Sequence, residues 1–388
     1  MSHSLRDLHI TMNEKLKVHI VSAAIPPAVD GIGDYTAHLA REVAKQATVK
    51  VLTAQEGSDP VPGVEVVQAF SIVDQKTAWN ITSIVEVDKP DWLVVQYNPF
   101  CFGRRGFNLH IPEAIRACRK RSPGTKIAVM AHEPYVPLTC WQFYIMTTYQ
   151  RWQLWRLGRS ADIVFFSIDQ WVERFTPWFP NAPVLHLPVG SNIGVTPTSR
   201  QEARNRLGIA DDSFVLGFFG TIHISRNLTR IQEAAKAVRD AGRNVLVLYI
   251  GPHSDKVKSA LVDIPLIADG PFPADEISRR FPAMDAYLAP FHDGISTRRG
   301  SFMCALAHGI PIVGTVGELT DKVLKESKDK AFLLADADDG PQFSADVLRI
   351  MEDAALRSSL SGEASRLFET EFSWQAISNR MLKAMATV

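Results

Sequence analysis

The chain has 388 residues, of which 46% are hydrophobic and 22% charged. This composition is typical of a globular protein and excludes a disordered tail, a collagen-like fibre and a coiled coil, while the length predicts two or three domains. Lys and Arg total 42, as do Asp and Glu, so the formal net charge is zero. A neutral chain has no overall attraction to nucleic acid or membrane, and a charged partner must meet a local patch.

The N-terminus lacks the features of a targeting segment. Residues 1–13 are polar and do not resemble a signal peptide, and residues 1–16 are expected to be flexible. No run of about 18 apolar residues exists, so no segment is expected to span a membrane. The chain has four cysteines: Cys101, Cys118, Cys140 and Cys304. They form no C-x-x-C pair and indicate inert thiols in a reducing cytosol.

Short apolar runs alternate with helical patterns in the first half of the chain. Residues 17–23 predict a buried strand, followed by a Gly-containing turn and a helix whose apolar positions include Tyr35, Leu39 and Val43. Further strands are predicted at residues 49–53, 92–96, 127–131 and 163–167. These runs are apolar on both faces, which is typical of a parallel sheet covered by helices on both sides.

The same alternation restarts in the second half. Strands are predicted at residues 214–220, 245–250, 264–268, 286–289, 310–314 and 332–335. Residues 183–198 contain three prolines and predict a linker.

The pattern predicts an α/β protein with two Rossmann-like parallel sheets facing each other across a cleft. The expected domains are residues 17–190 and 191–371, and residues 372–388 are expected to form a helix that packs back toward the N-terminal domain. Ligands of such sheets bind at the carboxyl ends of the strands, so a ligand shared by both domains would lie in the cleft.

Two motifs follow predicted strands of the first domain. Gly31 and Gly33 open the first helix, where free backbone N–H groups favour an anion. The spacing is not that of a dinucleotide fingerprint, and the alternative is a tight turn with Asp34 as the helix N-cap. His132 and Glu133 follow the strand at residues 127–131. This position suits a functional group, but a structural turn with a satisfied histidine is an equal alternative.

The third motif spans residues 285–315. Its loop carries Asp293, Gly294, Ser296, Arg298 and Arg299, and a helix is predicted from Gly300 to His308. Arginine binds phosphate oxygens through charge-assisted, often bidentate hydrogen bonds, and a helix N-terminus adds about 0.3–1 kcal/mol. The motif therefore predicts a diphosphate site, against the alternative of a solvated arginine pair.

Over residues 17–385 the chain resembles the retaining GT-B glycosyltransferases of the bacterial "group 1" family. The most specific match is the run Ala305-Leu306-Ala307-His308-Gly309-Ile310-Pro311-Ile312-Val313, which is similar to the family's A-M-A-x-G-x-P-V-V. Supporting matches are the Gly31-Ile32-Gly33 turn, His132, residues 220–226, Gly251 and the Phe372-Ser373-Trp374 helix start.

The resemblance implies that a nucleoside-diphosphate sugar, with UDP as the first expectation, binds the C-terminal domain and an acceptor binds the N-terminal domain. It gives catalytic or leaving-group roles to His132, Asp293, Arg298 and Arg299. Gly31 and Gly33 would face the diphosphate and sugar, and Arg226 would replace the family's phosphate-binding lysine. The other residues expected to contact the donor are Gly220, Thr221, Gly251, Gly270, Phe272, Gly294, Ser296, Gly300, Ser301 and Cys304. The base is expected to stack near residues 269–272. No cofactor and no metal are expected.

The donor loop departs from the family pattern. The family carries two glutamates at a fixed spacing here, and the corresponding places hold Ser296 and Cys304. Asp293-Gly294 stands in for the first glutamate and its glycine if the loop is longer, and Thr221 occupies the place of a family arginine. A catalytically weak or inactive nucleotide- or glycan-binding protein is therefore the alternative to a working transferase, with a sugar-nucleotide epimerase ranked last.

The acceptor is inferred from one basic segment and the helix after it. Residues 98–126 hold seven Arg and Lys against one Glu, a local excess that would attract anionic lipid. Trp141, Ile145, Trp152 and Trp155 then follow at helical spacing. The stripe faces either a membrane interface or, by preference, the protein core. The prediction is a cytosolic enzyme at the inner membrane face that extends a glycan or a lipid-linked acceptor, with no nucleic-acid partner and the oligomeric state left open.

Overall fold

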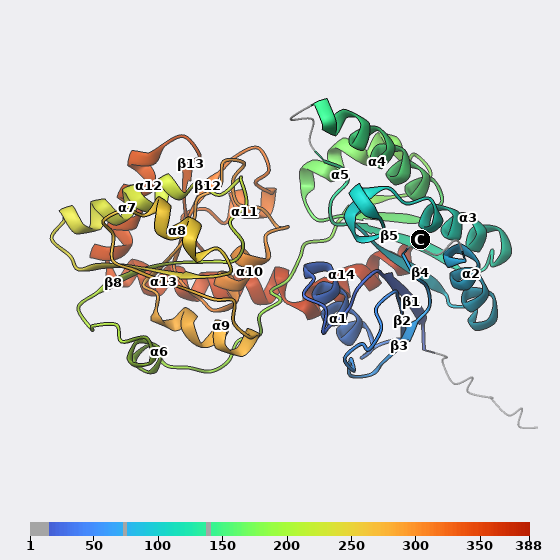
Figure 1. The fold of residues 1–388 in the computed structure, drawn as a ribbon, viewed down its shortest axis with the longest axis horizontal. Helices are drawn as coiled ribbons and strands as arrows, with labels where there is room; N and C mark the ends of the chain where they lie inside the picture. The colour runs from blue at the N-terminus through green and yellow to red at the C-terminus, as the bar shows by residue number, and fades with distance from the viewer. Residues whose placement is uncertain (1–14, 73–75, 137–140) are drawn as a thin grey trace, which may run out of the picture.

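Two parallel β-sheets organise the chain in the computed structural model, which describes residues 15–72, 76–136 and 141–388 (Figure 1). Within these residues, the N-terminal sheet has seven strands in the order β3-β2-β1-β4-β5-β6-β7. The C-terminal sheet, within the same part of the chain, has six strands in the order β10-β9-β8-β11-β12-β13. Both orders reverse beside the first strand of the sheet, which is where such sheets bind ligands.

The N-terminal domain alternates strands and helices. Its strands are β1 (Lys17–Ser22), β2 (Thr48–Thr53), β3 (Val64–Gln68), β4 (Trp92–Tyr97), β5 (Lys126–Ala131), β6 (Ile163–Phe166) and β7 (Val184–His186). Its helices are α1 (Gly31–Val43), α2 (Thr77–Asp88), α3 (His110–Arg121), α4 (Trp141–Arg159) and α5 (Asp169–Phe175), with short 3-10 turns η1 (Pro99–Cys101), η2 (Arg104–Gly106) and η3 (Thr176–Trp178).

The C-terminal domain repeats the alternation. Its strands are β8 (Phe214–Phe219), β9 (Val245–Ile250), β10 (Leu266–Asp269), β11 (Ala286–Ala289), β12 (Ile312–Val316) and β13 (Leu333–Asp336). Its helices are α6 (Arg200–Leu207), α7 (Leu228–Asp240), α8 (Ser254–Ala260), α9 (Ala274–Arg280), α10 (Gly300–Ala307), α11 (Lys322–Glu326), α12 (Gly340–Glu352) and α13 (Ala354–Leu367), with the turn η4 (Phe281–Ala283). A π-helical turn, η5 (Phe368–Phe372), precedes the last helix, α14 (Trp374–Thr387).

The predicted α/β class with two parallel sheets is confirmed. The central strands β4 and β5 are buried almost throughout, which explains why continuous apolar runs predicted them. Two edge strands were not predicted. β3 is only half-buried and interrupted by Glu65, and β7 is three residues long and lies inside the predicted linker.

Helix α14 lies against the N-terminal domain although it ends the chain (Figure 1). Ile377, Met381 and Met385 are buried in the same core as β1 and the apolar face of α1. The indole of Trp374 stacks on His38 at 5.1 Å between ring centroids and donates to the carbonyl of Ser191. The last helix therefore packs on both α1 and the segment that joins the domains. Residues 1–16 were predicted to be flexible, and residues 1–14 of them lie outside the described residues.

The carboxyl ends of the two sheets meet at the domain junction. Glu133, directly after β5, forms an ion pair with Arg298 in the loop after β11, with Oε1 and Nη1 3.5 Å apart. Asn192, in the connecting segment, donates to the carbonyl of Gly31 at 3.3 Å. Groups from both domains therefore reach the edge where functional residues of such sheets collect.

The stripe on α4 is exposed, so the preferred prediction that it faces the core is wrong. Ile145, Trp152 and Trp155 are 67%, 40% and 43% exposed. The opposite face packs inward instead, through Leu154 and Leu157, which are fully buried in the core of the N-terminal domain. Gln153 on the same face donates to the carbonyl of Gly106 and accepts from the amide of Asn108. The side chain of Trp141 lies outside the described residues. Amphipathic spacing does not by itself identify which face is buried.

Carboxylates neutralise part of the basic segment, at three of its seven basic residues. Arg116 pairs with Glu113 and Arg119 with Asp162, each at 2.5 Å, and Arg121 lies 3.5 Å from Glu86. Arg104, Arg105, Lys120 and Lys126 have no carboxylate partner in the described part of the chain. Within the described residues, no helix is long and apolar enough to cross a bilayer.

Candidate donor site

Three glycines form the floor of the candidate site. Gly220, Gly251 and Gly270 follow β8, β9 and β10, which are neighbours in the sheet. A Cβ on Gly251 would lie 2.6 Å from the carbonyl oxygen of Gly220, and one on Gly270 would lie 2.9 Å from that of Gly251. Gly270 also has a φ of +128°, which side chains rarely adopt. The structure thus brings these three predicted donor residues together as a close-packed backbone surface.

A buried guanidinium lies beside this glycine floor. Arg226 is 6% exposed, and its Nη2 donates to the carbonyl of Phe219 at 3.0 Å and to Ser301 Oγ at 3.4 Å. Its Nε and Nη1 are buried and have no hydrogen-bond partner among the described residues. A charged donor left unpaired in the interior costs more than about 1–3 kcal/mol, and an anion would remove that cost.

The arginine loop, residues 290–299, joins β11 to α10. Asp293 accepts from both Arg298, at 3.3 Å, and Arg299, whose Nη2 lies closer still. Arg299 also stacks on the Phe291 ring at 3.7 Å and donates to Ser225 Oγ at 3.3 Å. The loop therefore fixes the two predicted arginines against one carboxylate and one aromatic ring.

Positive charge is concentrated in this loop. Burial lowers the pKa of Arg299 to about 10; Asp293 opposes this shift, while Arg298 and Arg226 add to it. The side chain remains charged at neutral pH. Three guanidinium groups lie here against two carboxylates, Asp293 of the loop and Glu133 of the other domain. This excess of positive charge favours a further anion.

The N-terminus of α10 completes this side of the site. The helix begins at Gly300, and no side chain in the described part of the chain caps it. Ser301 in its first turn accepts from Arg226, and a Cβ on Gly220 would lie 3.3 Å from the Ser301 Cβ. The helix start, Arg226 and the glycine floor are therefore contiguous, which is the arrangement that binds phosphate.

Two predicted donor residues do not border this space. Ser296 and Cys304 are fully buried, and the Ser296 hydroxyl has no partner among the described residues. Cys304 faces His308, with Sγ and Nδ1 3.7 Å apart, and burial raises the pKa of its thiol. Neither residue presents a group to a ligand in this conformation, so the places of the family's glutamates are structural here.

The other predicted donor residues in the C-terminal domain are Thr221, Phe272 and Gly294. Thr221 is exposed, and Phe272 is half-buried with the Arg280 guanidinium 3.8 Å above its ring. Gly294 has a φ of +83° and packs against the amide of Gly317. The predicted base-stacking ring is thus present, with one face covered by an arginine.

The Gly31–Gly33 turn is built differently from the anion cradle considered for it. Asp30 is the N-cap of α1, and its Oδ1 accepts from the amides of Ile32, at 3.0 Å, and Gly33, at 2.6 Å. The prediction that Asp34 is the N-cap is wrong, because Asp30 holds that position and the helix begins at Gly31. The first-turn amides already have a carboxylate partner, so an anion at this helix start would have to displace it.

His132 is buried at the carboxyl end of β5. Its Nε2 lies 2.8 Å from Gln96 Oε1, and its ring meets Tyr35 edge-on at 4.6 Å. Burial lowers the pKa of His132 to about 3, so the ring is neutral at physiological pH. With the Gln96 amide in this orientation, Nε2 carries the proton and Nδ1 is an acceptor with no partner among the described residues.

Glu133 is a site residue to which the sequence assigned no role. It is half-exposed, pairs with Arg298 across the junction and accepts weakly from Asn98 Nδ2 at 3.5 Å. Its position next to His132, after a strand that was expected to carry a functional group, could have marked it as a site residue. Because its partner comes from the other domain, the sequence alone could not show the contact.

Acidification should destabilise the protein through its buried histidines. The pKa of His19 is lowered to about 4 and that of His132 to about 3, in both cases mainly by burial, whereas an unfolded histidine titrates near 6.5. Below pH 6.5 the unfolded state therefore binds more protons, and the free energy of unfolding should fall by about 1.4 kcal/mol per pH unit for each histidine.

Chemical denaturation at pH 7.5, 6.5 and 5.5 measures this dependence. His132→Gln should reduce the proton uptake on unfolding by about one proton in the acidic range. Equal slopes for the variant and the wild type would show that His132 is not buried in its neutral form.

Two parallel-sheet domains whose strand carboxyl ends face each other define the GT-B fold, and comparison with solved structures agrees. The chain is similar to sucrose-phosphate synthase from Thermosynechococcus elongatus, with a TM-score of 0.67 and 14% identity over 96% of this chain and 99% of that one. HepE from Anabaena, in complex with UDP and glucose, matches with a TM-score of 0.65 and 14% identity over 96% of this chain and 100% of that one. WaaG, a glycosyltransferase involved in lipopolysaccharide biosynthesis, matches with a TM-score of 0.64 and 14% identity over 96% of this chain and 100% of that one.

Sequence comparison adds no assignment. No family model matches the chain, and no curated protein matches it. At 14% identity these structures establish the shared fold, and the function has to be argued from the site of this chain.

Proposed function

We propose that this protein is a retaining glycosyltransferase that moves a hexose-type sugar from a nucleoside-diphosphate sugar to a glycan or lipid-linked acceptor. The observation that carries the proposal is the buried guanidinium of Arg226, with two unpaired nitrogens next to the uncapped start of α10. Both nitrogens are closed off from solvent in this conformation, so a diphosphate would satisfy them once the side chains that cover them move aside. The diphosphate would also lie near Arg299, whose neighbour Arg298 pairs with Glu133 of the N-terminal domain.

The chemistry follows from where charge develops. As the bond between the sugar and the diphosphate breaks, negative charge grows on the leaving oxygen. Arg226, Arg299 and the amides of α10 would stabilise that charge from fixed positions, which is the largest contribution that such a site can make. Neutral His132 offers Nδ1 as an acceptor for a sugar hydroxyl, because Gln96 holds the proton on Nε2.

The donor is proposed to be a UDP-sugar, since HepE, one of the structures with this fold, was solved with UDP and glucose. A thermal-shift panel of UDP, GDP, ADP and TDP tests it. A ligand at 100 times its dissociation constant adds about 2.7 kcal/mol of stability, so the preferred base should give the largest shift. Release of that nucleotide from its sugar conjugate, in the presence of glycan acceptors, then tests transfer.

A second candidate is a nucleotide-binding protein without turnover. Its support is that Asp293 already pairs with Arg298 and Arg299 and that the places of both family glutamates are buried. Binding of a nucleoside diphosphate with no release from any sugar conjugate would favour this candidate. Absence of binding by all four nucleotides would contradict both.

The exposed surface of α4 supports a membrane-bound acceptor. A hollow of about 510 Å³ is lined by Arg151, Trp152, Trp155, Arg159, Pro177, Trp178 and Pro180. Arg151 lies 5.2 Å from the Trp178 ring centroid and Arg159 lies 5.7 Å from that of Trp155, and neither has a carboxylate partner in the described part of the chain. Aromatic rings beside unpaired guanidinium groups are typical of a surface that enters the interface of an anionic bilayer.

We expect Trp152→Ala combined with Trp155→Ala to weaken binding to anionic vesicles by about tenfold or more, because two partly exposed indoles lose their contact with the bilayer. Co-sedimentation with phosphatidylglycerol vesicles measures the loss, and raised salt should reduce wild-type binding through the arginines. Trp79→Ala, at a 63% exposed indole on α2, is the matched control and should bind normally. Equal binding by the double variant and the control, or binding that ignores anionic lipid content, would contradict the proposal.

A further inference from the structure

Two short helices, one from each domain, begin next to each other at the domain junction. In the N-terminal domain α5 begins at Asp169, and in the C-terminal domain α11 begins directly after its N-cap residue, Asp321. In neither helix does the side chain of the N-cap residue bond to the helix that it precedes. The first amides of both helices therefore need partners from elsewhere.

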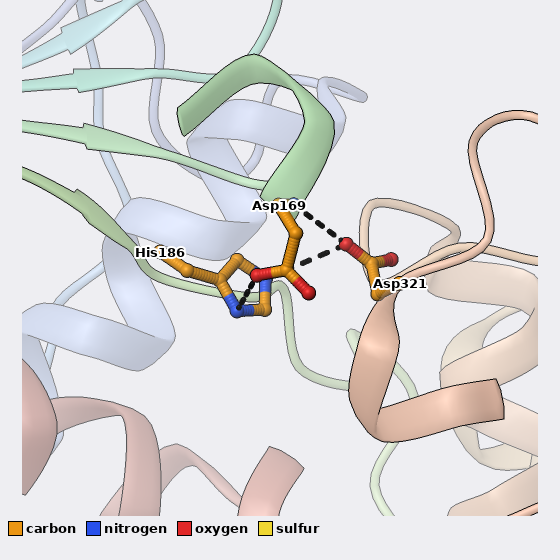
Figure 2. Close-up of side chains that lie close together, drawn as sticks. All are labelled: Asp169, His186 and Asp321. Atoms are coloured by element: carbon orange, nitrogen blue, oxygen red, sulfur yellow. Dashed lines mark hydrogen bonds and ion pairs between the residues drawn. The ribbon is translucent and has the colours of Figure 1, made fainter. Parts of the chain in front are cut away.

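Each helix is capped by a carboxylate of the other domain. Figure 2 shows Asp169 and Asp321 side by side at the junction, with His186 next to Asp169. Asp321 Oδ1 accepts from the amide of Asp169 at 2.7 Å, and Asp169 Oδ2 accepts from the amide of Lys322 at 3.0 Å. Hydrogen bonds from backbone N–H groups to ionised carboxylates are among the stronger ones in proteins. Both exist only while the two domains are in contact.

The same carboxylate reaches the arginine loop. Asp321 Oδ2 accepts from the amide of Thr297 at 2.6 Å. The Thr297 hydroxyl donates to the carbonyl of Ser167, in the N-terminal domain, at 2.7 Å. That hydroxyl has one hydrogen, so it accepts from His186 Nε2, 2.8 Å away. Thr297 directly precedes Arg298, so these bonds hold the chain next to both arginines.

The ligand atoms of Asp169, His186 and Asp321 lie within 4.8 Å of one another, close enough for a metal ion. The protein already uses the carboxylate oxygens, however. Both oxygens of Asp321 and one of Asp169 accept backbone N–H groups, and Asp169 Oδ1 lies 3.3 Å from His186 Nδ1. The arrangement therefore fits contact between the domains better than a cation.

We propose that Asp169, His186, Thr297 and Asp321 form an interdomain clasp that positions the arginine loop for donor binding. The segment that carries Asp321 is also tied to the loop, because the amide of Leu319 donates to the carbonyl of Asp293 at 3.0 Å. The Leu319 side chain in turn packs on the core of the N-terminal domain. The functional part of this inference rests on the proposed role of the arginine loop; the clasp itself does not.

Hydrogen exchange tests the clasp without any ligand. In Asp321→Ala, the amides of Asp169, in the other domain, and Thr297 should exchange about 10-fold to 100-fold faster. In Asp169→Ala, the amide of Lys322 should likewise exchange about 10-fold to 100-fold faster. Asp346→Ala removes a carboxylate that is equally buried but lies on α12, and it should leave these amides unchanged. Unchanged exchange at Asp169 in Asp321→Ala would overturn the clasp.

A matched pair at Thr297 tests the positioning role. Thr297→Val keeps the shape but removes the hydroxyl, so residues 295–299 should exchange faster and UDP affinity, measured by calorimetry, should fall about tenfold. Thr297→Ser keeps the hydroxyl and should restore both to within about twofold. If Thr297→Val matches the wild type in loop exchange, the positioning role is wrong, even where Asp321→Ala does not fold.

The two proposals fail in different ways. If the wild type binds no UDP or other nucleoside diphosphate, the proposed function fails, and the exchange rates still decide whether the clasp orders the loop. If the wild type binds UDP but Thr297→Val binds it equally well with unchanged loop exchange, the clasp inference fails and the proposed function stands.

Discussion

Replacing Arg226 with Met is expected to weaken UDP binding by about 10-fold to 100-fold without lowering the stability of the free protein. The loss of affinity follows because hydrogen bonds from a charged donor contribute about 1.5–3 kcal/mol. Replacing a buried residue usually destabilises a protein, but here no loss of stability is expected. Two of the guanidinium nitrogens are buried without a hydrogen-bond partner among the described residues. Removing the charge relieves that cost, which offsets the loss of the two Nη2 hydrogen bonds and of the contact with the Phe291 ring.

Calorimetry with UDP and thermal unfolding of the free protein measure the two effects. Arg226→Lys keeps the charge but not the planar donor geometry and should lie between Met and the wild type. Arg239→Met is the control, since Arg239 is an exposed residue of the same domain, and it should bind UDP normally. A variant that binds UDP like the wild type, or one that loses stability like a core truncation, would show that Arg226 is structural.

His132→Ala is expected to lower kcat by about 10-fold to 100-fold while changing UDP affinity less than about twofold. The sugar hydroxyl that donates a hydrogen bond to Nδ1 would be left without a partner in the bound state, and such a loss costs about 1–3 kcal/mol. UDP lacks the transferred sugar and its hydroxyls, so UDP affinity should not change.

Steady-state turnover of the sugar nucleotide, together with UDP calorimetry, separates the two quantities. Gln96→Met leaves the imidazole in place but removes the group that fixes its proton, so it should cause a smaller loss of kcat. Normal turnover by His132→Ala would end its assignment to the sugar.

The sheets were predictable because their chemistry is local. A strand buried on both faces requires a continuous apolar run, and β4, β5 and β9 show one. The edge strands β3 and β7 escaped prediction because an edge strand meets water on one side and is short or interrupted by polar residues.

The site was predictable only where its residues share one segment. Arg298 and Arg299 precede the α10 start in sequence, so a phosphate site could be read there. A partner that the fold brings from elsewhere, such as Glu133 on Arg298, could not be predicted. The role of a residue within the segment was also not settled by its position. Asp293 was expected to act in the reaction, and the structure shows it paired with both arginines.

The interdomain contacts were beyond sequence reasoning for a related reason. Asp169 and Asp321 are 152 residues apart and belong to different domains. Each looks like an ordinary residue near a helix start, and only the fold shows that each caps the other's helix. Similarly, the spacing of aromatic residues on α4 predicted an amphipathic helix correctly, but which face packs on the core depends on β-strands and loops distant in sequence.

A crystal structure of the protein with UDP tests the central claim most directly, because it shows where the diphosphate lies. The expected result is a phosphate group within hydrogen-bond distance of Arg226 Nε or Nη1, with the first-turn amides of α10 and the Arg299 guanidinium completing the contacts. UDP bound elsewhere, with Arg226 still unpaired and both loop arginines still on Asp293, would contradict the donor site and the transferase built on it.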